Sequence, residues 1–113
     1  MTIDEITSIV EGRSVTSIPA SYEIRYAFSS DLMSDVLTVL EDDVLLITGL
    51  VNIQTVRTAS MADISTVLLV RGKTATSEMI DLATEHRIVL LETAYSMFRA
   101  SGVLYDAGLK PLF

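Results

Sequence analysis

The chain alternates between short, continuously apolar runs and longer segments whose apolar residues recur with the period of a helix. Three such runs lie from Val44 onwards, at Val44–Ile47, Thr66–Val70 and Ile88–Leu91. Apolar residues at nearly every position are typical of strands that are covered on both faces, as in a parallel sheet. We therefore predict three buried strands in this part of the chain.

A single helix is expected after each of these strands. Asn52–Met61 and a segment capped by Thr76 or Ser77 have helical spacing, and a last helix is expected from Thr93 to Gly108. Strands that alternate with single helices form right-handed βαβ units. The pattern therefore predicts a three-layer α/β/α fold with a mostly parallel central sheet. The helix positions expected to face the core are Ile53, Val56, Ala59, Met61, Met79, Ile80, Ala83, Met97, Phe98 and Tyr105.

The two ends of the chain differ in pattern. Near the start, the spacing predicts a helix over Ile3–Val10, with Thr2 and Glu5 forming a capping box. Gly12 is expected to end this helix. At the other end, Lys110–Phe113 is interpreted as a short tail without regular structure.

The segment between the first helix and the first buried strand predicts three further elements. Arg13–Ile18 alternates enough for a short strand, which Pro19 closes because proline cannot donate to a ladder. Tyr22–Ser29 alternates between two faces and predicts a half-exposed strand. Ser30–Leu40 predicts a helix whose first turn holds Asp31 near the positive end of the helix dipole. Its expected inward positions are Leu32, Met33, Val36, Leu37 and Leu40.

Composition narrows the class of protein. The chain has 113 residues, half of them hydrophobic, which is enough for one domain spanning residues 1–113. Its net charge of -7 argues against non-specific nucleic-acid binding, which needs a basic surface. It has no cysteine, which excludes disulfides and thiol chemistry. Its apolar runs fall far short of the about 20 residues that cross a bilayer, so we expect a cytoplasmic protein without membrane contact.

Polar residues follow the predicted strands and form the candidate site. In open parallel sheets, ligands bind beyond the carboxyl ends of the strands, where backbone amides and cations can hold an anion. The residues at these ends, or just after them, are Thr48, Gly49, Asn52, Arg57, Arg71, Gly72, Lys73 and Thr93. They predict a site for a small anionic or nucleotide-like ligand. The alternative is that they only form tight turns and cap helices.

Residues of the types that carry catalysis are sparse. His86 is the only histidine, and its place near the end of a helix suits a charge that complements the helix dipole. Arg71–Thr74 reads RGKT, but it lacks the upstream glycine of a phosphate-binding loop. Two carboxylate pairs, Asp31 with Asp35 and Asp42 with Asp43, are interpreted as solvated. We predict that the chain is not an enzyme and needs no metal or cofactor.

The segment from Leu45 to Phe98 resembles a DRTGG domain. The shared pattern is a helix of the type E-x-x-x-L-A, seen at Glu78–Ala83, and a strand that ends in threonine, seen at Ile88–Thr93, with Tyr95 starting the next helix. Val70–Lys73 stands where the family has its threonine–glycine–glycine turn. These domains also resemble the N-terminal domain of HPr kinase/phosphorylase. The resemblance implies a regulatory or interaction domain that forms a homodimer.

Two hypotheses for function follow. The first is a non-catalytic regulatory domain that acts through self-association, with Met33 and the Tyr22–Ser29 arm as a candidate subunit contact, and through a protein partner. The second is a sensor that binds a small anionic or nucleotide-like ligand at the candidate site. Ligand-dependent stabilisation separates the two, because a ligand that binds only the native state raises the melting temperature.

Overall fold

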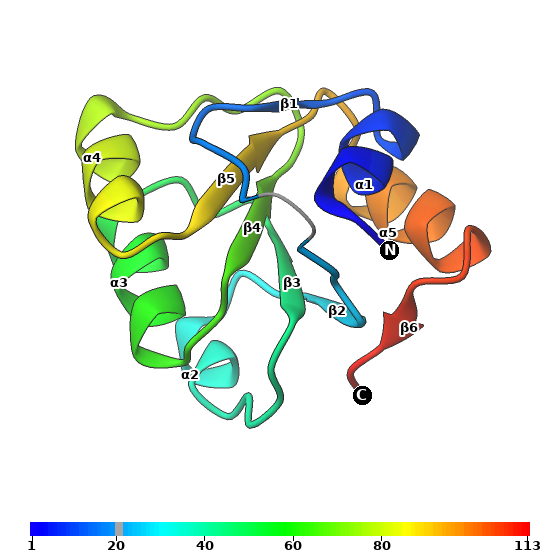
Figure 1. Ribbon diagram of the computed structural model, residues 1–113, viewed down its shortest axis with the longest axis horizontal. Helices are drawn as coiled ribbons and strands as arrows, with labels where there is room; N and C mark the ends of the chain where they lie inside the picture. The colour runs from blue at the N-terminus through cyan, green and yellow to red at the C-terminus, as the bar shows by residue number, and fades with distance from the viewer. Residues whose placement is uncertain (20–21) are drawn as a thin grey trace.

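The computed structural model describes residues 1–19 and 22–113, which fold around one central sheet (Figure 1). The strand order is β1-β5-β4-β3-β2-β6. β1 runs antiparallel to β5, and the other neighbouring strands are parallel. The bounds of the strands are β1 Arg13–Ser14, β2 Tyr26–Ser29, β3 Val44–Thr48, β4 Thr66–Leu69, β5 Val89–Glu92 and β6 Lys110–Pro111.

Helices cover both faces of the sheet (Figure 1). On one face, α1 (Ile3–Ile9) and α5 (Met97–Asp106) pack on an apolar cluster that includes Ile47 and Leu68. On the other face, α2, α3 and α4 pack on a second cluster that includes Leu46 and Val67. The bounds of these three helices are α2 Met33–Val36, α3 Ile53–Met61 and α4 Ser77–Glu85. The predicted three-layer α/β/α fold with a mostly parallel sheet is confirmed.

From β2 onwards, the connections change direction once. From β2 to β5 the chain steps one strand at a time in one direction, and α2, α3 and α4 all lie on the same face. After β5 it turns back, and α5 crosses the opposite face to bring β6 beside β2. Reversing both direction and face keeps the same hand of crossover. The helices that follow β4 and β5 therefore leave toward opposite faces.

The buried strands were predicted well because their pattern is unambiguous. Every residue of β3, β4 and β5 is buried. The helix ends were also readable from the sequence. Thr2 Oγ1 accepts from the N–H of Glu5 at 3.1 Å, and the Glu5 carboxylate accepts from the N–H of Thr2 at 3.1 Å, so the predicted capping box is present. Thr76, one of the two expected caps, caps α4, and Asn52, which was expected to begin a helix, caps α3.

The predicted helix over Ser30–Leu40 is wrong in length, because α2 covers only Met33–Val36. Of the five positions expected to face inward, Leu32, Leu37 and Leu40 are exposed. The physical reason lies at the start of the segment. The Asp31 carboxylate does not serve the first turn of a helix but turns to the end of β3, where it accepts from Gly49 N at 2.7 Å.

The segments at the edges of the sheet were also misjudged. The predicted strands at 13–18 and 22–29 shorten to β1 and β2, and the expected tail contains β6, which pairs with β2.

The last helix is capped by Ser96 rather than by Thr93. Three residues expected in the core are exposed, namely Met61, Phe98 and Tyr105. Within the described residues, no helix has both the length and the apolar character needed to cross a membrane.

Candidate functional site

A cavity of about 290 Å³ opens where the helices after β4 and β5 leave toward opposite faces. Such a reversal between neighbouring parallel strands leaves a crevice at their carboxyl ends, which is where open α/β sheets bind ligands. The start of β1 contributes as well, because β1 is antiparallel and begins at this same edge. The lining residues are Glu11, Gly12, Arg13, Gly72, Lys73, Thr74, Glu92, Thr93 and Ala94.

The loop after β4 has an unusual backbone. Arg71 and Gly72 both have positive φ, at 66° and 71°. This conformation is ordinary for glycine but disfavoured for arginine. It is stabilised by the loop after β5, because Arg71 N donates to Tyr95 O at 2.7 Å and Gly72 N donates to Thr93 O at 2.9 Å. Arg71 is exposed and directly precedes Gly72, which lines the cavity.

A buried carboxylate anchors the opposite wall of the cavity. Glu92 is 5% exposed, and its Oε1 accepts from Nε and Nη2 of Arg13 at 3.0 and 2.8 Å. Its Oε2 accepts from the N–H of Ala75 at 2.6 Å. These bonds tie β1, the end of β5 and the loop before α4 together. Arg13 was not among the predicted site residues, since it follows Gly12 in a segment that shows only a weak strand pattern.

A second polar cluster ties the end of β3 to its neighbours. Asp31 Oδ1 accepts from Thr48 Oγ1 at 2.9 Å and from Gly49 N at 2.7 Å. Lys73 Nζ donates to Gly49 O at 2.5 Å. Thr48 and Gly49 therefore have partners within the chain and do not line the cavity. Asp31, which the sequence placed on a helix, is the residue that holds them.

The other predicted site residues also divide into some that line the cavity and some that have a different role. Asn52 Oδ1 accepts from the backbone N–H of Gln54 at 2.9 Å, so it caps α3. Arg57 is exposed on α3 and does not line the cavity. Thr93 lines the cavity but is buried, and its hydroxyl donates to Val10 O at 2.6 Å. Of the eight predicted site residues, the structure gathers Gly72, Lys73 and Thr93 around the cavity, with Arg71 next to them.

The segment between β5 and α5 adds an aromatic group to this edge. The hydroxyl of Tyr95 donates to the Glu11 carboxylate. This hydrogen bond raises the pKa of Tyr95, because it favours the protonated phenol. The Arg99 guanidinium lies 3.9 Å from the centroid of the Tyr95 ring. Within residues 1–19 and 22–113, no three histidine, aspartate or glutamate side chains come together as they would to hold a metal ion.

Comparisons with known proteins give one informative result. No family model matches the chain, and no curated protein matches it. Among solved structures, the fold matches the crystal structure of the CBS and DRTGG domains of the regulatory region of Clostridium perfringens pyrophosphatase, complexed with its activator diadenosine tetraphosphate. The TM-score is 0.71 at 15% identity, over 91% of this chain and 45% of that one. The chain therefore shares its fold with part of that regulatory region.

Proposed function

We propose that residues 1–113 form one DRTGG-type domain, a non-catalytic regulatory module that acts through self-association and a protein partner. The fold likeness to a pyrophosphatase regulatory region supports this proposal. We also propose that the domain is similar to the N-terminal domain of HPr kinase/phosphorylase and that the protein is cytoplasmic. Both statements stay predictions.

The observation that supports self-association is the apolar surface of the segment around α2. Leu32, Leu37 and Leu40 are 59%, 52% and 96% exposed, although they lie within nine residues of one another. Exposed leucines gathered on one short segment are a feature of surfaces that pair with another chain. A second copy of this chain would bury them in a symmetric contact.

Light scattering at several protein concentrations tests this proposal. A dimer is expected, and the double variant Leu37→Glu, Leu40→Glu should shift it to monomer. Phe98→Glu is the matched control, because Phe98 is 89% exposed but lies on α5, on the opposite face. A wild-type monomer at all concentrations would contradict the proposal, and so would a dimer that the double variant leaves intact.

A second candidate function is favoured by the cavity between the ends of β4 and β5. Arg13 and Lys73 line it, and Arg71 directly precedes its lining residue Gly72, so three basic residues lie at this edge of the sheet in a chain that is acidic as a whole. We propose that this cavity binds a small phosphate-bearing anion and that the domain senses it. The Arg13 guanidinium is held by Glu92, so Arg71 and Lys73, whose ammonium donates to a backbone carbonyl, are the cations expected to recognise the ligand.

Calorimetric titration with inorganic pyrophosphate and with AMP tests the sensor. Binding of either anion is expected, and Arg71→Ala and Lys73→Ala should each weaken it at least tenfold. Arg57→Ala removes a cation outside the cavity and should leave the affinity unchanged. Equal affinity in the wild type and both cavity variants would rule out this site.

A further inference from the structure

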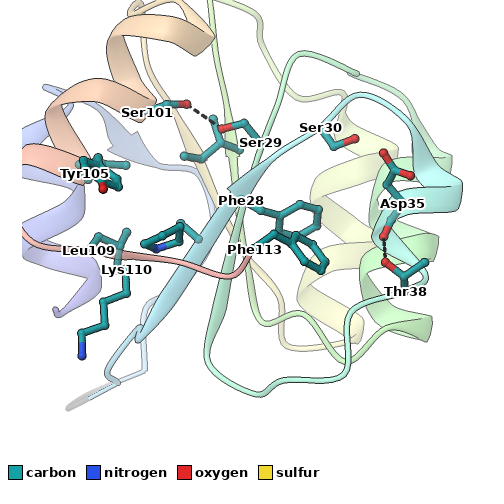
Figure 2. A pocket seen from close by; sticks show the side chains of 14 residues that line it. Phe28, Ser29, Ser30, Asp35, Thr38, Ser101, Tyr105, Leu109, Lys110 and Phe113 are labelled. Atoms are coloured by element: carbon teal, nitrogen blue, oxygen red, sulfur yellow. Dashed lines mark hydrogen bonds between the residues drawn. The ribbon is translucent and has the colours of Figure 1, made fainter.

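A second cavity lies on the other side of the sheet, around the free edge of β2 (Figure 2). Its volume is about 600 Å³. Small-molecule sites typically measure about 300–1,000 Å³, so this cavity is large enough for a ligand of that kind. It shares no lining residue with the cavity between β4 and β5. It was not foreseen from the sequence, because the residues around it come from β2, α2, α5 and the C-terminal segment.

The floor of the cavity is an unpaired piece of backbone. Tyr26 N donates to Asp43 O and Ser30 N donates to Ile47 O, so the even-numbered residues of β2 bond toward β3. Backbone groups alternate between the two sides of a strand, and the N–H and C=O of Ser29 therefore point to the side of β6. Along β2, the bonding on that side reaches only Ala27, whose C=O accepts from Leu112 N at 3.0 Å.

Ser29 thus presents one donor and one acceptor with no partner among the described residues. The two groups belong to one residue and point the same way. They form a pair of hydrogen-bonding sites suited to a flat molecule that carries a donor and an acceptor on one edge. Ser29 is exposed, so in the free protein water can satisfy both groups.

Aromatic rings form the walls of the same cavity. Phe28 and Phe113 lie edge to face with their centroids 5.9 Å apart. Tyr105, 69% exposed, projects from α5 on the other side of β2 (Figure 2). The hydroxyls of Ser29 and Ser101 are 2.6 Å apart and add a polar point beside the backbone pair. Rings packed around a hydrogen-bonding edge suit an aromatic ligand better than an aliphatic one.

We propose that this cavity binds a planar heteroaromatic group of the nucleobase class. The base would pair its donor and acceptor with the backbone of Ser29 and pack its ring among Phe28, Phe113 and Tyr105. An aliphatic ligand would remove water from Ser29 without replacing its hydrogen bonds, which is unfavourable. A peptide strand added to β2 would gain few backbone bonds, since β6 already pairs with Tyr26 and Ala27.

Nuclear magnetic resonance titration of the full chain with adenosine, guanosine, cytidine and uridine tests the proposal. At least one nucleoside is expected to bind saturably and to shift the amide signal of Ser29. Naphthalene serves as a probe of similar shape that lacks a hydrogen-bonding edge. It should bind at least tenfold more weakly than the best nucleoside, and equal binding would overturn the role of Ser29.

Variants locate the binding. Ser101→Phe fills the cavity and should weaken nucleoside binding at least tenfold. Tyr105→Ala removes an exposed ring without disturbing the core and should also weaken it, which keeps the test valid if Ser101→Phe fails to fold. Phe98→Ala removes an exposed ring of the same helix outside the cavity and should have no effect.

The outcomes separate this proposal from the sensor described above. Lys73→Ala should leave nucleoside binding unchanged while it weakens the binding of pyrophosphate. Nucleoside binding that is lost with Lys73→Ala and kept with Tyr105→Ala would overturn the proposal. The absence of saturable binding by all four nucleosides would overturn it as well, whatever the result with pyrophosphate.

Discussion

Gly12 and Gly102 occupy opposite steric environments. A Cβ added at Gly12 would lie 2.4 Å from Glu92 O, because Gly12 immediately precedes β1, which pairs with the end of β5. A Cβ added at Gly102, inside α5, would meet nothing within 4 Å. The first position requires glycine for space, whereas the second only carries the entropic disadvantage of glycine in a helix.

We therefore predict that the two alanine substitutions change stability in opposite directions. Gly102→Ala should raise the free energy of unfolding by about 0.5–1 kcal/mol. Gly12→Ala should lower it, because the backbone of Glu92 has to move. Urea denaturation of both variants measures the two changes. A destabilised Gly102→Ala would indicate that α5 needs the glycine for a contact with another molecule.

Tyr22 gives the clearest dependence of stability on pH. Its hydroxyl lies 2.6 Å from Ser65 Oγ and 3.3 Å from Asp43 Oδ1, which ties the segment before β2 to the beginnings of β3 and β4. Partial burial raises the pKa of Tyr22, and the nearby Asp43 carboxylate adds to the rise. The neutral phenol is therefore favoured in the folded state.

The sign of the pH effect follows from that shift. A folded-state pKa above the unfolded value contributes stability that is complete below about pH 10 and is lost as the pH rises through the folded pKa. Wild type should lose stability on this alkaline side, and Tyr22→Phe should lose less while being about 1 kcal/mol less stable at neutral pH. Thermal melts from pH 7 to 11 measure both effects, with Tyr105→Phe as the control. Parallel curves for all three proteins would contradict the prediction.

At the scale of single residues, capping was predictable and long-range pairing was not. Thr2 and Asn52 act on amides two or three residues away, so their roles follow from local sequence. Asp31 and Arg13 act on residues 18 and 79 positions away. No local pattern marks such partners. The cavity accordingly brings the predicted Lys73 and Thr93 together with Arg13 and Glu92, which were not predicted, and a ligand role for any of them stays a prediction.

At the scale of elements, we expect the Arg13–Glu92 ion pair to hold β1 against β5 more strongly than the backbone bonds of this short strand do. It pairs only two residues with β5, and the Arg13–Glu92 contact joins an exposed guanidinium to a buried carboxylate. Removal of the arginine leaves the carboxylate with one backbone donor, Ala75 N. A buried charge that loses a partner is unfavourable.

We predict that Arg13→Met lowers the free energy of unfolding by about 1–3 kcal/mol. Arg13→Lys should recover only part of the loss, since an ammonium cannot repeat the two bonds that Nε and Nη2 make. Urea denaturation measures both. A neutral Arg13→Met would show that β1 is held mainly by its backbone bonds to β5.

The interior strands were readable because burial on both faces leaves a run of apolar residues, and β3, β4 and β5 show it in full. The edge strands β1 and β6 pair with only one neighbour and are two residues long. A two-residue strand has no period to detect. The pairing of β6 with β2 was therefore not predicted, and neither was the cavity that lies beside it at the free edge of β2.

At the scale of the whole molecule, the architecture was predictable and the surface was not. The βαβ rhythm determined the layers, whereas the exposure of Phe98, Tyr105 and Leu40 contradicts the apolar character of these residues. Helical spacing alone cannot tell a face that meets the core from one that meets solvent or another protein. The exposed residues are accordingly where the proposals for self-association and ligand binding arise.

The placement of β1 and β6 at the outer edges of the sheet also has a kinetic consequence. Strands β2 to β5 are consecutive in sequence and neighbours in space, and each connection between them contains a single helix, so their contacts are the more local ones of the sheet. The partners of the edge strands are far away in sequence, as with Tyr26 beside Lys110 and Arg13 beside Glu92. Closing such long loops costs conformational entropy before the contact stabilises the chain.

Folding should therefore begin within β2–β5 and end with the attachment of the two edges. In stopped-flow experiments, Val67→Ala in β4 should slow refolding, whereas Arg13→Met should leave refolding nearly unchanged and speed unfolding. Slower refolding of Arg13→Met together with unchanged refolding of Val67→Ala would instead place the edge strands in the folding nucleus. If the rates change as predicted, the outermost strands of this sheet are the last to attach during folding and the first to detach during unfolding.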